Sequence, residues 1–567
     1  MSPPTADETA PLLPLNNDAE ALASRDAEHG RPTNGLLYMT LLTLGFGGLQ
    51  IAWSVELSHG SPYLLSLGVS KSLMALVWIA GPLTGSIVVP YVGILSDNCR
   101  LPWGRRRPYL VGGTLGTVAS LLLLAWAREI VGGISSLFGR TDASEGGGGG
   151  DVVVVVVAVV GIYLVDIAIN TVQAALRAFV VDCAPPGRQE LANSMAGRLT
   201  GVGNIIGYVA GYSDLPSRLP FLGRTQFQIL CAIACLALSV TITLSVFFIR
   251  EETGEGRPPV KTPGIGPFFF NLMRRSVRRL PPQTKRVCRV QFCAWIGFFP
   301  LLFYSSSYIA EIYVQPFLRA RPDMTREEVE VLYQQATRIG TFALLINAIV
   351  SLSTNVFLPF FITPSLDDER KEEAEQGAFL FSSARWLRIP GLTVKRAWIG
   401  SLVLFALAMF CCPFVSSVEA ATALIGVAGI TWAMALWAPW AIIGAEINRR
   451  DGKRQSSPRQ EDDEGEADEA LGEEEEEEGD EAGVVLGIHN MAIAVPQIVA
   501  TVGSSIIFKL WQKPRGTPGD GSIGVVMALG GACVLLSVLF AAGIDDDDDD
   551  DDDDDGDDED DEVGGMI

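Results

Sequence analysis

Long apolar runs recur along the whole chain and are separated by short polar segments. A run of about 20 apolar residues crosses the hydrocarbon core of a bilayer as a helix, whereas barrel strands alternate in hydropathy and need only about ten. The pattern therefore predicts an all-α membrane protein with twelve transmembrane helices that contact the lipid bilayer. The runs lie near residues 36–58, 72–95, 109–128, 152–182, 194–213, 226–249, 289–314, 331–362, 397–415, 418–446, 484–508 and 521–543.

The longest central polar segment divides these runs into two sets of six. Segment 250–288 is rich in proline and basic residues, so we expect it to link an N-terminal half, 35–249, to a C-terminal half, 289–544. Two such halves joined by a linker are typical of secondary transporters that rock around a central site.

The net charge of −24 on the 567-residue chain comes from two acidic runs. Residues 451–481 contain 16 acidic residues and residues 545–562 contain 17; without these runs, 33 acidic and 39 basic residues remain. Segments with so few apolar residues cannot bury a core. We therefore expect disorder in the loop 447–483, the tail 545–567 and the polar N-terminus 1–34. Nothing in this pattern favours nucleic-acid binding.

Lysine and arginine concentrate in alternate loops. If both termini are cytoplasmic, the cytoplasmic segments hold 29 of the 42 basic residues and the outer loops hold 11. Basic residues in short loops stay on the cytoplasmic side, so we expect this orientation. The start of the chain lacks the pattern of a cleaved signal peptide. We expect the plasma membrane, with the vacuolar membrane as the alternative because a dileucine-like ETAPLL precedes the first run.

The fourth apolar run carries a stripe of polar residues. Asp166, Asn170, Gln173 and Arg177 stand at offsets 0, 4, 7 and 11, which places them on one helix face. A charge inside a membrane helix costs at least about 2.5–3.5 kcal/mol and so needs a reason. Asp166 falls near the middle of the run. The stripe predicts a water-filled cavity; the alternative is polar contact between helices.

Other charged or polar groups lie within apolar runs. Glu311 is near the outer end of the seventh run and Arg338 lies in the outer part of the eighth, so they can pair, for structure or for function. Glu56 falls near the outer end of the first run, where exposure to solvent is the alternative to a binding role. His59 and His489 are candidate proton carriers, although a single histidine at a helix end is more often an ordinary interfacial residue.

No pattern favours an enzyme. The segment GVGNIIG at 201–207 has the spacing GxGxxxG, follows no strand and lies inside a membrane helix, where such glycines let helices approach closely. The nine cysteines show no CxxC or Cys/His spacing for a metal. We expect no metal and no cofactor.

The loop between the second and third runs has a further pattern. In GILSDNCRLPWGRRRPY, an aspartate is followed by glycine and three arginines: Asp97, Gly104, Arg105, Arg106 and Arg107. It resembles the loop 2–3 signature of the major facilitator superfamily, and in its longer form the sucrose and α-glucoside–proton symporter branch, of the glycoside-pentoside-hexuronide type. The charges can form ion pairs, cap helix ends and anchor the loop to anionic lipid. We interpret it as a cytoplasmic latch; topology anchoring alone is the alternative.

The resemblance extends through most of the membrane region, including ANSMAGRLTGVGNIIGYVAGY and WIGFFPLLFYSSSYIAEIY. It implies the major facilitator fold. It also implies that Asp166 is the carboxylate that carries the proton and binds sugar, with Arg177 as a required charge. Ile309-Ala310-Glu311 stands where plant relatives have Gly-Arg-Glu, which is fungal-like. The substrate-binding residues we expect are Asp166, Asn170, Gln173, Arg177, Glu56, Glu311, Arg338 and Asn490.

The function expected from these observations is symport of sucrose, maltose or a related α-glucoside with a proton as the coupling ion. Two alternatives stay open. One is a sugar sensor that does not transport, with the acidic segments as its output surface. The other is a cation-coupled carrier of a different small solute.

Overall fold

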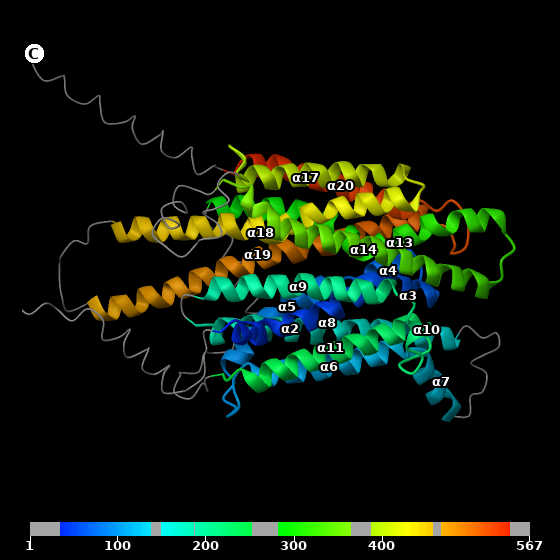
Figure 1. Cartoon of the computed structure of the whole chain (residues 1–567), viewed down its shortest axis with the longest axis horizontal. Coiled ribbons are helices and arrows are strands. Elements are labelled where there is room, and N and C mark those ends of the chain that lie inside the picture. The colour runs from blue at the N-terminus through cyan, green and yellow to red at the C-terminus, as the bar shows by residue number, and fades with distance from the viewer. Residues whose placement is uncertain are drawn as a thin grey trace, which may run out of the picture.

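A computed structural model describes residues 35–137, 149–185, 188–251, 282–363, 387–456 and 467–544. At 444–456 and 467–488 only the backbone is described. Every regular element in these ranges is a helix, and the long helices run side by side along one axis (Figure 1). The N-terminus 1–34, most of the linker 250–288 and the tail 545–567 lie outside the described residues.

The first half of the bundle makes six passes along this axis. Its elements are α2 (Leu36–Val55), η1 (Glu56–Gly60), α3 (Ser61–Ser66), α4 (Lys71–Val77), α5 (Ala80–Asp97), α6 (Arg107–Ala125), α7 (Ala127–Leu137), α8 (Gly149–Cys183), α9 (Gln189–Tyr212), α10 (Leu215–Arg218) and α11 (Gln226–Phe248). Within this half, α2 packs on α9 and α11, and α8 packs on α5 and α6.

The second half also makes six passes. Its elements are α13 (Pro282–Ala320), α14 (Arg326–Phe357), η2 (Leu358–Phe360), α17 (Val394–Cys411), η4 (Cys412–Phe414), α18 (Val418–Ser456), α19 (Ala467–Trp511) and α20 (Ser522–Ala542). Helix α13 packs on α14, α19 and α20, and α18 packs on α14 and α17. The halves meet where α9 contacts α14 and where α4 and α5 contact α19.

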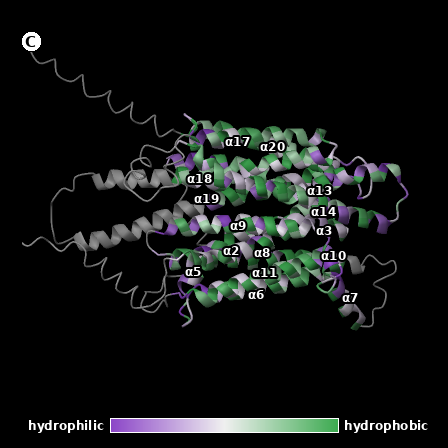
Figure 2. Ribbon diagram, in the orientation of Figure 1, coloured by the Kyte–Doolittle hydropathy of each residue, from purple (hydrophilic) through white to green (hydrophobic). Residues whose placement is uncertain are grey.

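The hydropathy of the described helices is that of a membrane protein. Eleven of them are long and apolar enough to cross a bilayer, and apolar residues cover the middle of the bundle while polar residues gather at its ends (Figure 2). The fifth expected span is present as α9, a 24-residue helix that is not among the eleven. Its sequence includes five glycines; at one of them, Gly203, a Cβ would lie 2.5 Å from the Gly47 carbonyl oxygen of α2. Glycine allows this close helix contact.

One expectation from the sequence is corrected by the helix boundaries. The first span continues to Ser66 through the π-helical turn η1, so Glu56 is an interior residue and not a helix-end residue. In the acidic segment 447–483, helix α18 ends at Ser456 and helix α19 begins at Ala467, while residues 457–466 lie outside the described residues. The disorder expected for this segment stays a prediction.

The two ends of the bundle differ. One end holds the loop 98–106, and we call it the arginine end; α18 and α19 project beyond the bundle there (Figure 1). The other end, which we call the distal end, holds the turns 67–70, 213–225, 321–325 and 512–521. Polar contacts join the two halves near the distal end: Ser61 donates to the Phe303 carbonyl oxygen (2.7 Å), and Ser72 lies 2.9 Å from the Ser505 hydroxyl.

Candidate functional site

Two carboxyl groups are buried inside the first half. Asp166, in the middle of α8, is 0% exposed, and Glu56, on η1, is 6% exposed. In the part of the chain that the structure describes, none of their four oxygens has a hydrogen-bond partner, and the two groups interact electrostatically. Gly81 of α5 leaves the space beside Asp166 open, because a Cβ there would lie 3.7 Å from Oδ1. An ionised carboxylate is far more expensive to bury without a partner than a neutral carboxylic acid. The pair is therefore a site where a proton can be held.

The rest of the α8 stripe continues from this pair toward the arginine end. Asn170 is buried and donates to Thr84 Oγ1 (3.2 Å) and to the Asp166 carbonyl oxygen (2.8 Å). Gln173 is half-buried and Arg177 is exposed. Within the described residues Arg177 has no ion-pair partner. Since Arg177 shares a helix face with the buried Asp166, its exposed side chain indicates an opening in the bundle.

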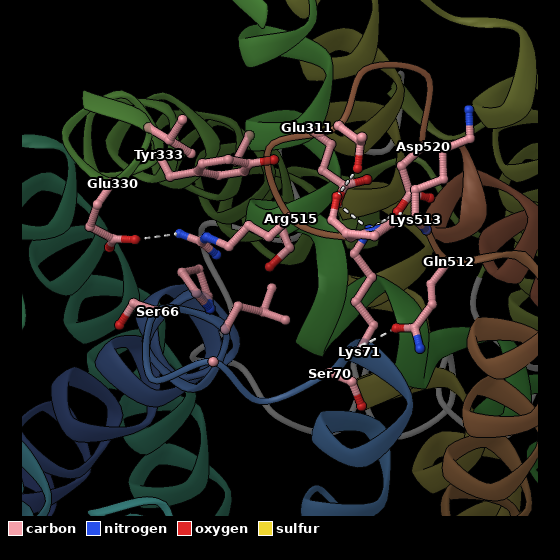
Figure 3. Close-up of a pocket in the computed structure, with 18 of the residues that line it drawn as sticks. Ser66, Ser70, Lys71, Glu311, Glu330, Tyr333, Gln512, Lys513, Arg515 and Asp520 are labelled. Carbon is pink, nitrogen blue, oxygen red and sulfur yellow. Dashed lines mark hydrogen bonds and ion pairs between the residues drawn. The ribbon is translucent and has the colours of Figure 1, made fainter. Parts of the chain in front are cut away.

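A cluster of charges joins the halves at the distal end (Figure 3). The Lys71 ammonium group, on α4, forms ion pairs with Glu311 of α13 and with Asp520, whose Oδ2 is 2.8 Å away. The Lys71 backbone N–H also donates to Gln512 Oε1 (3.0 Å). Burial raises the pKa of Asp520, but the Lys71 ammonium and hydrogen bonds from Ser522 outweigh it and lower the pKa below its usual value. Asp520 therefore stays ionised at neutral pH, and the cluster holds the halves together.

A cavity borders this cluster, with Lys71, Glu311 and Asp520 in its lining. It has a volume of about 540 Å³ and is lined by both halves. In its wall, Arg515 lies 3.1 Å from Glu330 and 4.0 Å above the ring of Tyr333 (Figure 3). Asp166 does not line it. Because ion pairs fill its floor, we interpret it as a vestibule at the distal end and not as the site of coupling.

The expected pairing of Glu311 with Arg338 is wrong. Glu311 pairs with Lys71, while Arg338 pairs with Asp214 (3.2 Å) and donates to the Tyr212 carbonyl oxygen (3.2 Å). Helix α14 packs against α9 of the other half, which turns the Arg338 side chain toward α9 and away from α13. The short distance between Glu311 and Arg338 along the sequence did not indicate which helix each side chain faces.

A small cavity lies between the halves, on a different set of helices. Its volume is about 80 Å³, and its lining includes the amides Gln50, Asn204, Asn347 and Asn355 together with Trp432. Gln50 Nε2 donates to Asn204 Oδ1 (2.9 Å). The sequence interpretation missed these residues, although amides inside apolar runs were a visible signal. Ligand pockets usually have volumes of about 300–1,000 Å³, so in this state the cavity is too small for a ligand of ordinary size.

The remaining candidates near the arginine end of the second half are not part of either cavity. Asn490 is half-buried, and within the described residues it makes no hydrogen bond to the α8 stripe. Its neighbour His489 is buried; its ring lies 4.4 Å from that of Trp440, and its Nε2 is 3.5 Å from Gln291 Nε2. The structure does not bring Asn490 together with Asp166.

The arginines of the loop form a connected cluster. Arg106 is 6% exposed and pairs with Asp97 and with Asp182 (2.7 Å) at the end of α8, which also pairs with Arg105 (2.7 Å). Glu251 accepts from the Arg106 backbone N–H (2.7 Å). These partners all belong to the first half, so the cluster ties α5, α6 and α8 to the end of α11. The sequence interpretation missed Asp182 and Glu251.

Two further groups in the cluster show how tightly it is packed. Arg107 donates to the carbonyl oxygens of Ile249 and Trp103. Gly104 has φ +127°, a conformation that favours glycine, and a Cβ there would clash with the Glu251 carboxylate. The glycine and the three arginines of the sequence signature therefore all take part in the same cluster of contacts.

Replacing Arg105, Arg106 and Arg107 together with glutamine should slow the exchange between conformations of the bundle roughly 10-fold, equivalent to about 1.4 kcal/mol, with ligand affinity unchanged. The reason is that the cluster fixes the helices of one half, which must move as a unit, while no arginine in it lines either of the two cavities described above. The rate of this exchange and the binding of ligand, measured on the same purified protein, test this. Arg100→Gln is the matched control because Arg100 is an exposed neighbour. An unchanged rate of exchange in the triple variant would leave the loop with a topology role alone.

The sequence of the chain is similar to those of known sugar transport proteins. The family model described as "MFS/sugar transport protein" matches residues 61–263. The general alpha-glucoside permease of Schizosaccharomyces pombe is 33% identical over 583 aligned residues, which cover 94% of this chain and 96% of that protein. The sucrose transport protein SUT1 of Oryza sativa subsp. japonica is 30% identical over 324 residues, 54% of this chain and 57% of that protein.

A solved structure shows the same fold. The E. coli xylose transporter XylE, in a partially occluded inward-open conformation, aligns with a TM-score of 0.52 at 12% identity and covers 90% of this chain and 100% of its own. The twelve-pass architecture is thus that of the major facilitator fold, and the matched proteins are transporters, not enzymes. With 33% identity across nearly the full length of a sugar permease, the chain belongs to the MFS sugar transport family of multi-pass membrane proteins.

Proposed function

We propose that this protein is a proton-coupled symporter of α-glucosides such as maltose or sucrose. The names of its relatives support the substrate class. The single observation that supports proton coupling is the buried pair Asp166 and Glu56, whose oxygens have no hydrogen-bond partner among the described residues. A carrier that moves a proton needs a group that is charged in one state and neutral in another, inside a cavity that can open.

We propose that the arginine end faces the cytoplasm and the distal end faces outward. This follows from the distribution of basic residues in the loops, and it places both termini inside. The described state is then closed to the outside, since the Lys71 cluster and the Ser61 and Ser72 contacts join the halves at that end. We favour the plasma membrane, with the vacuolar membrane as the alternative.

The sugar is expected to bind where the amide-lined cavity widens. Amides donate and accept hydrogen bonds in a fixed geometry, and an aromatic ring such as Trp432 offers an apolar face, a combination suited to sugar hydroxyls and ring C–H groups. Gln50 comes from α2, close in sequence to Glu56 on the following turn. In this proposal, the sugar site and the proton site share one helix. Asn170 and Gln173 of α8 lie on the wall of the opening, where they can contact the sugar.

The transport cycle follows from charge and solvation. With the distal end open, the carboxyl pair takes up a proton and the sugar fills the central cavity. Neutralising the pair removes the cost of burying its charge, so the halves can close over the sugar at the distal end. Opening at the arginine end hydrates the site, and Arg177, three turns along α8, favours return of Asp166 to its ionised form. Glu311 and Arg338 act in closing the distal end and not in binding sugar.

Uptake of radiolabelled maltose and sucrose by cells without other transporters of these sugars tests the proposal. We expect accumulation that is driven by an inward proton gradient and abolished by a protonophore. Competition with a panel of sugars and amino acids identifies the preferred solute. Binding of sugar without uptake would instead favour a sensor, and accumulation that ignores the proton gradient would favour a carrier coupled to another cation.

The proposed sugar site in the amide-lined cavity leads to a separate prediction. Gln50→Ala and Asn347→Ala should each raise the KM for sugar about 2- to 10-fold, because a hydrogen bond is worth about 0.5–1.5 kcal/mol. The ratio of protons to sugar should not change, since neither amide carries a proton. The control is Thr171→Ala on α8, which removes a polar group that bonds only the Ile167 carbonyl oxygen of its own helix. An unchanged KM in both amide variants would move the sugar site elsewhere.

A further inference from the structure

The turn η1 carries two titratable groups. It spans Glu56–Gly60, follows α2 without a break and contains the buried residues Glu56, Ser58 and His59. A π-helical turn inserts an extra residue into a helix and frequently occurs at functional sites. The insertion changes which faces the following residues present, so Glu56 and His59 can serve different neighbours.

The hydrogen bonds of His59 fix the form of its ring. The Ser58 hydroxyl donates its one hydrogen to the Ser54 carbonyl oxygen (2.6 Å). His59 Nδ1 lies 2.8 Å from the same hydroxyl oxygen, so Nδ1 must be the donor in this contact. The other nitrogen of the neutral ring, Nε2, then carries a free lone pair. It is buried and has no partner among the described residues.

The ring lies at the seam between the halves. A Cβ on Gly211 of α9 would be 3.0 Å from His59 Cε1 and 2.7 Å from the methyl group of Thr341 on α14. Helix α9 belongs to the first half and α14 to the second, and η1 contacts both. Glu56, three residues earlier on the same turn, interacts with Asp166 inside the first half. The turn therefore connects the seam to the carboxyl pair.

The surroundings of His59 contain no charge that holds a proton on its ring. Among the described residues, none of the titratable or charged groups on the packed elements forms a hydrogen bond or ion pair with the ring. These groups include Glu56 on the same turn, Tyr63 on α3, Asp166 on α8, Tyr208 and Tyr212 on α9, Tyr304, Tyr308 and Glu311 on α13, and Tyr333 and Arg338 on α14. In this closed state, a proton on Nε2 would be an unpaired buried charge, which is strongly unfavourable.

We infer that His59 takes up the coupling proton from the outside and passes it to the carboxyl pair; this rests on the proposed proton symport. When the seam opens at the distal end, water reaches Nε2 and the lone pair accepts a proton, giving an imidazolium. When the seam closes, the N–H bond at Nε2 breaks and an O–H bond forms on Glu56 or Asp166. The ring returns to neutral and the pair loses one negative charge, so protons and charge balance.

The test uses purified full-length protein in liposomes, with an internal pH dye and labelled maltose. His59→Gln keeps a polar side chain of similar length but does not carry a proton at these pH values. We expect proton-driven uptake to fall about 100-fold, within the range for removal of a proton-transfer group. Counterflow, which exchanges internal for external sugar without net proton movement, should stay within about 2-fold. External imidazole should restore uptake in His59→Ala.

His489→Gln is the matched control, because His489 is also buried and also has one ring nitrogen without a partner. It should leave proton-driven uptake unchanged. The inference is overturned if His59→Gln takes up sugar at the wild-type rate at every external pH, or if counterflow falls as much as uptake. A wild-type protein that moves sugar without protons overturns the proposed symport itself, which separates the two failures.

Discussion

Asp166→Asn is expected to abolish proton-driven accumulation of sugar while sugar exchange continues. Asparagine keeps the size of the side chain but cannot bind and release a proton. Because Asp166 is fully buried and has no hydrogen-bond partner within the described ranges, the neutral amide resembles the protonated acid and does not add a buried charge. Accumulation against a gradient should fall to the background, and counterflow should persist. Both are measured with labelled maltose in the same vesicles.

Thr84→Ala is a useful control for this experiment. It removes the hydroxyl that accepts from Asn170, on the same face of α8, and leaves both carboxyl groups in place. We expect it to keep proton-driven accumulation. If Asp166→Asn accumulated sugar as well as the wild type, Asp166 would have no part in coupling and the role would pass to Glu56. If it lost counterflow too, with normal expression at the membrane, Asp166 would also be needed to bind sugar.

Lys71→Met is expected to shift the protein away from the state closed at the distal end. Removing one member of a buried ion pair costs about 3–5 kcal/mol because the other charge stays buried. Here two carboxylates, Glu311 and Asp520, would be left without their ammonium partner. The ratio of closed to open protein should fall by about two to four orders of magnitude. An impermeant thiol reagent added outside should then label a cysteine at Ser307, a buried position on the wall of the vestibule, much faster.

A combined variant tests whether the unpaired carboxylates cause the opening. Combining Lys71→Met with Glu311→Gln and Asp520→Asn removes all three charges, so labelling should return toward the wild-type rate. Lys513→Met is the control for loss of a positive charge, since Lys513 lines the same vestibule but is exposed. Labelling that stays slow in Lys71→Met would show that apolar contacts alone close this end.

The sequence predicted the fold well because hydropathy is the main signal for segments that cross a bilayer. It also placed the α8 stripe correctly on one face, since the positions in a helix follow from its period. It did not predict partners between helices. The sequence did not indicate a role for Lys71, and the expected pairing of Glu311 with Arg338 was wrong. The reason is that the direction of each side chain depends on how the helices pack.

His59 shows a second limit. Local sequence indicated a helix end near residue 58, and a histidine there reads as interfacial. The π-helical turn carries the helix on to Ser66 and buries both Glu56 and His59. No propensity scale indicates such a turn. The amides of the central cavity were visible as polar residues in apolar runs, but only the packing of α2, α9 and α14 brings them together.

The modest hydropathy of α9 has a consequence for how the protein is made. A segment enters the bilayer from the translocon according to its own apolar content, and α9 is the one pass that does not reach the hydropathy of the others. Its glycines fit closely against α2, which is synthesised first. The newly made chain would therefore have to retain α2 beside the insertion machinery until α9 arrives. Bulky substitutions at Gly203 would then appear as failed membrane insertion, degraded early, before any transport step is reached.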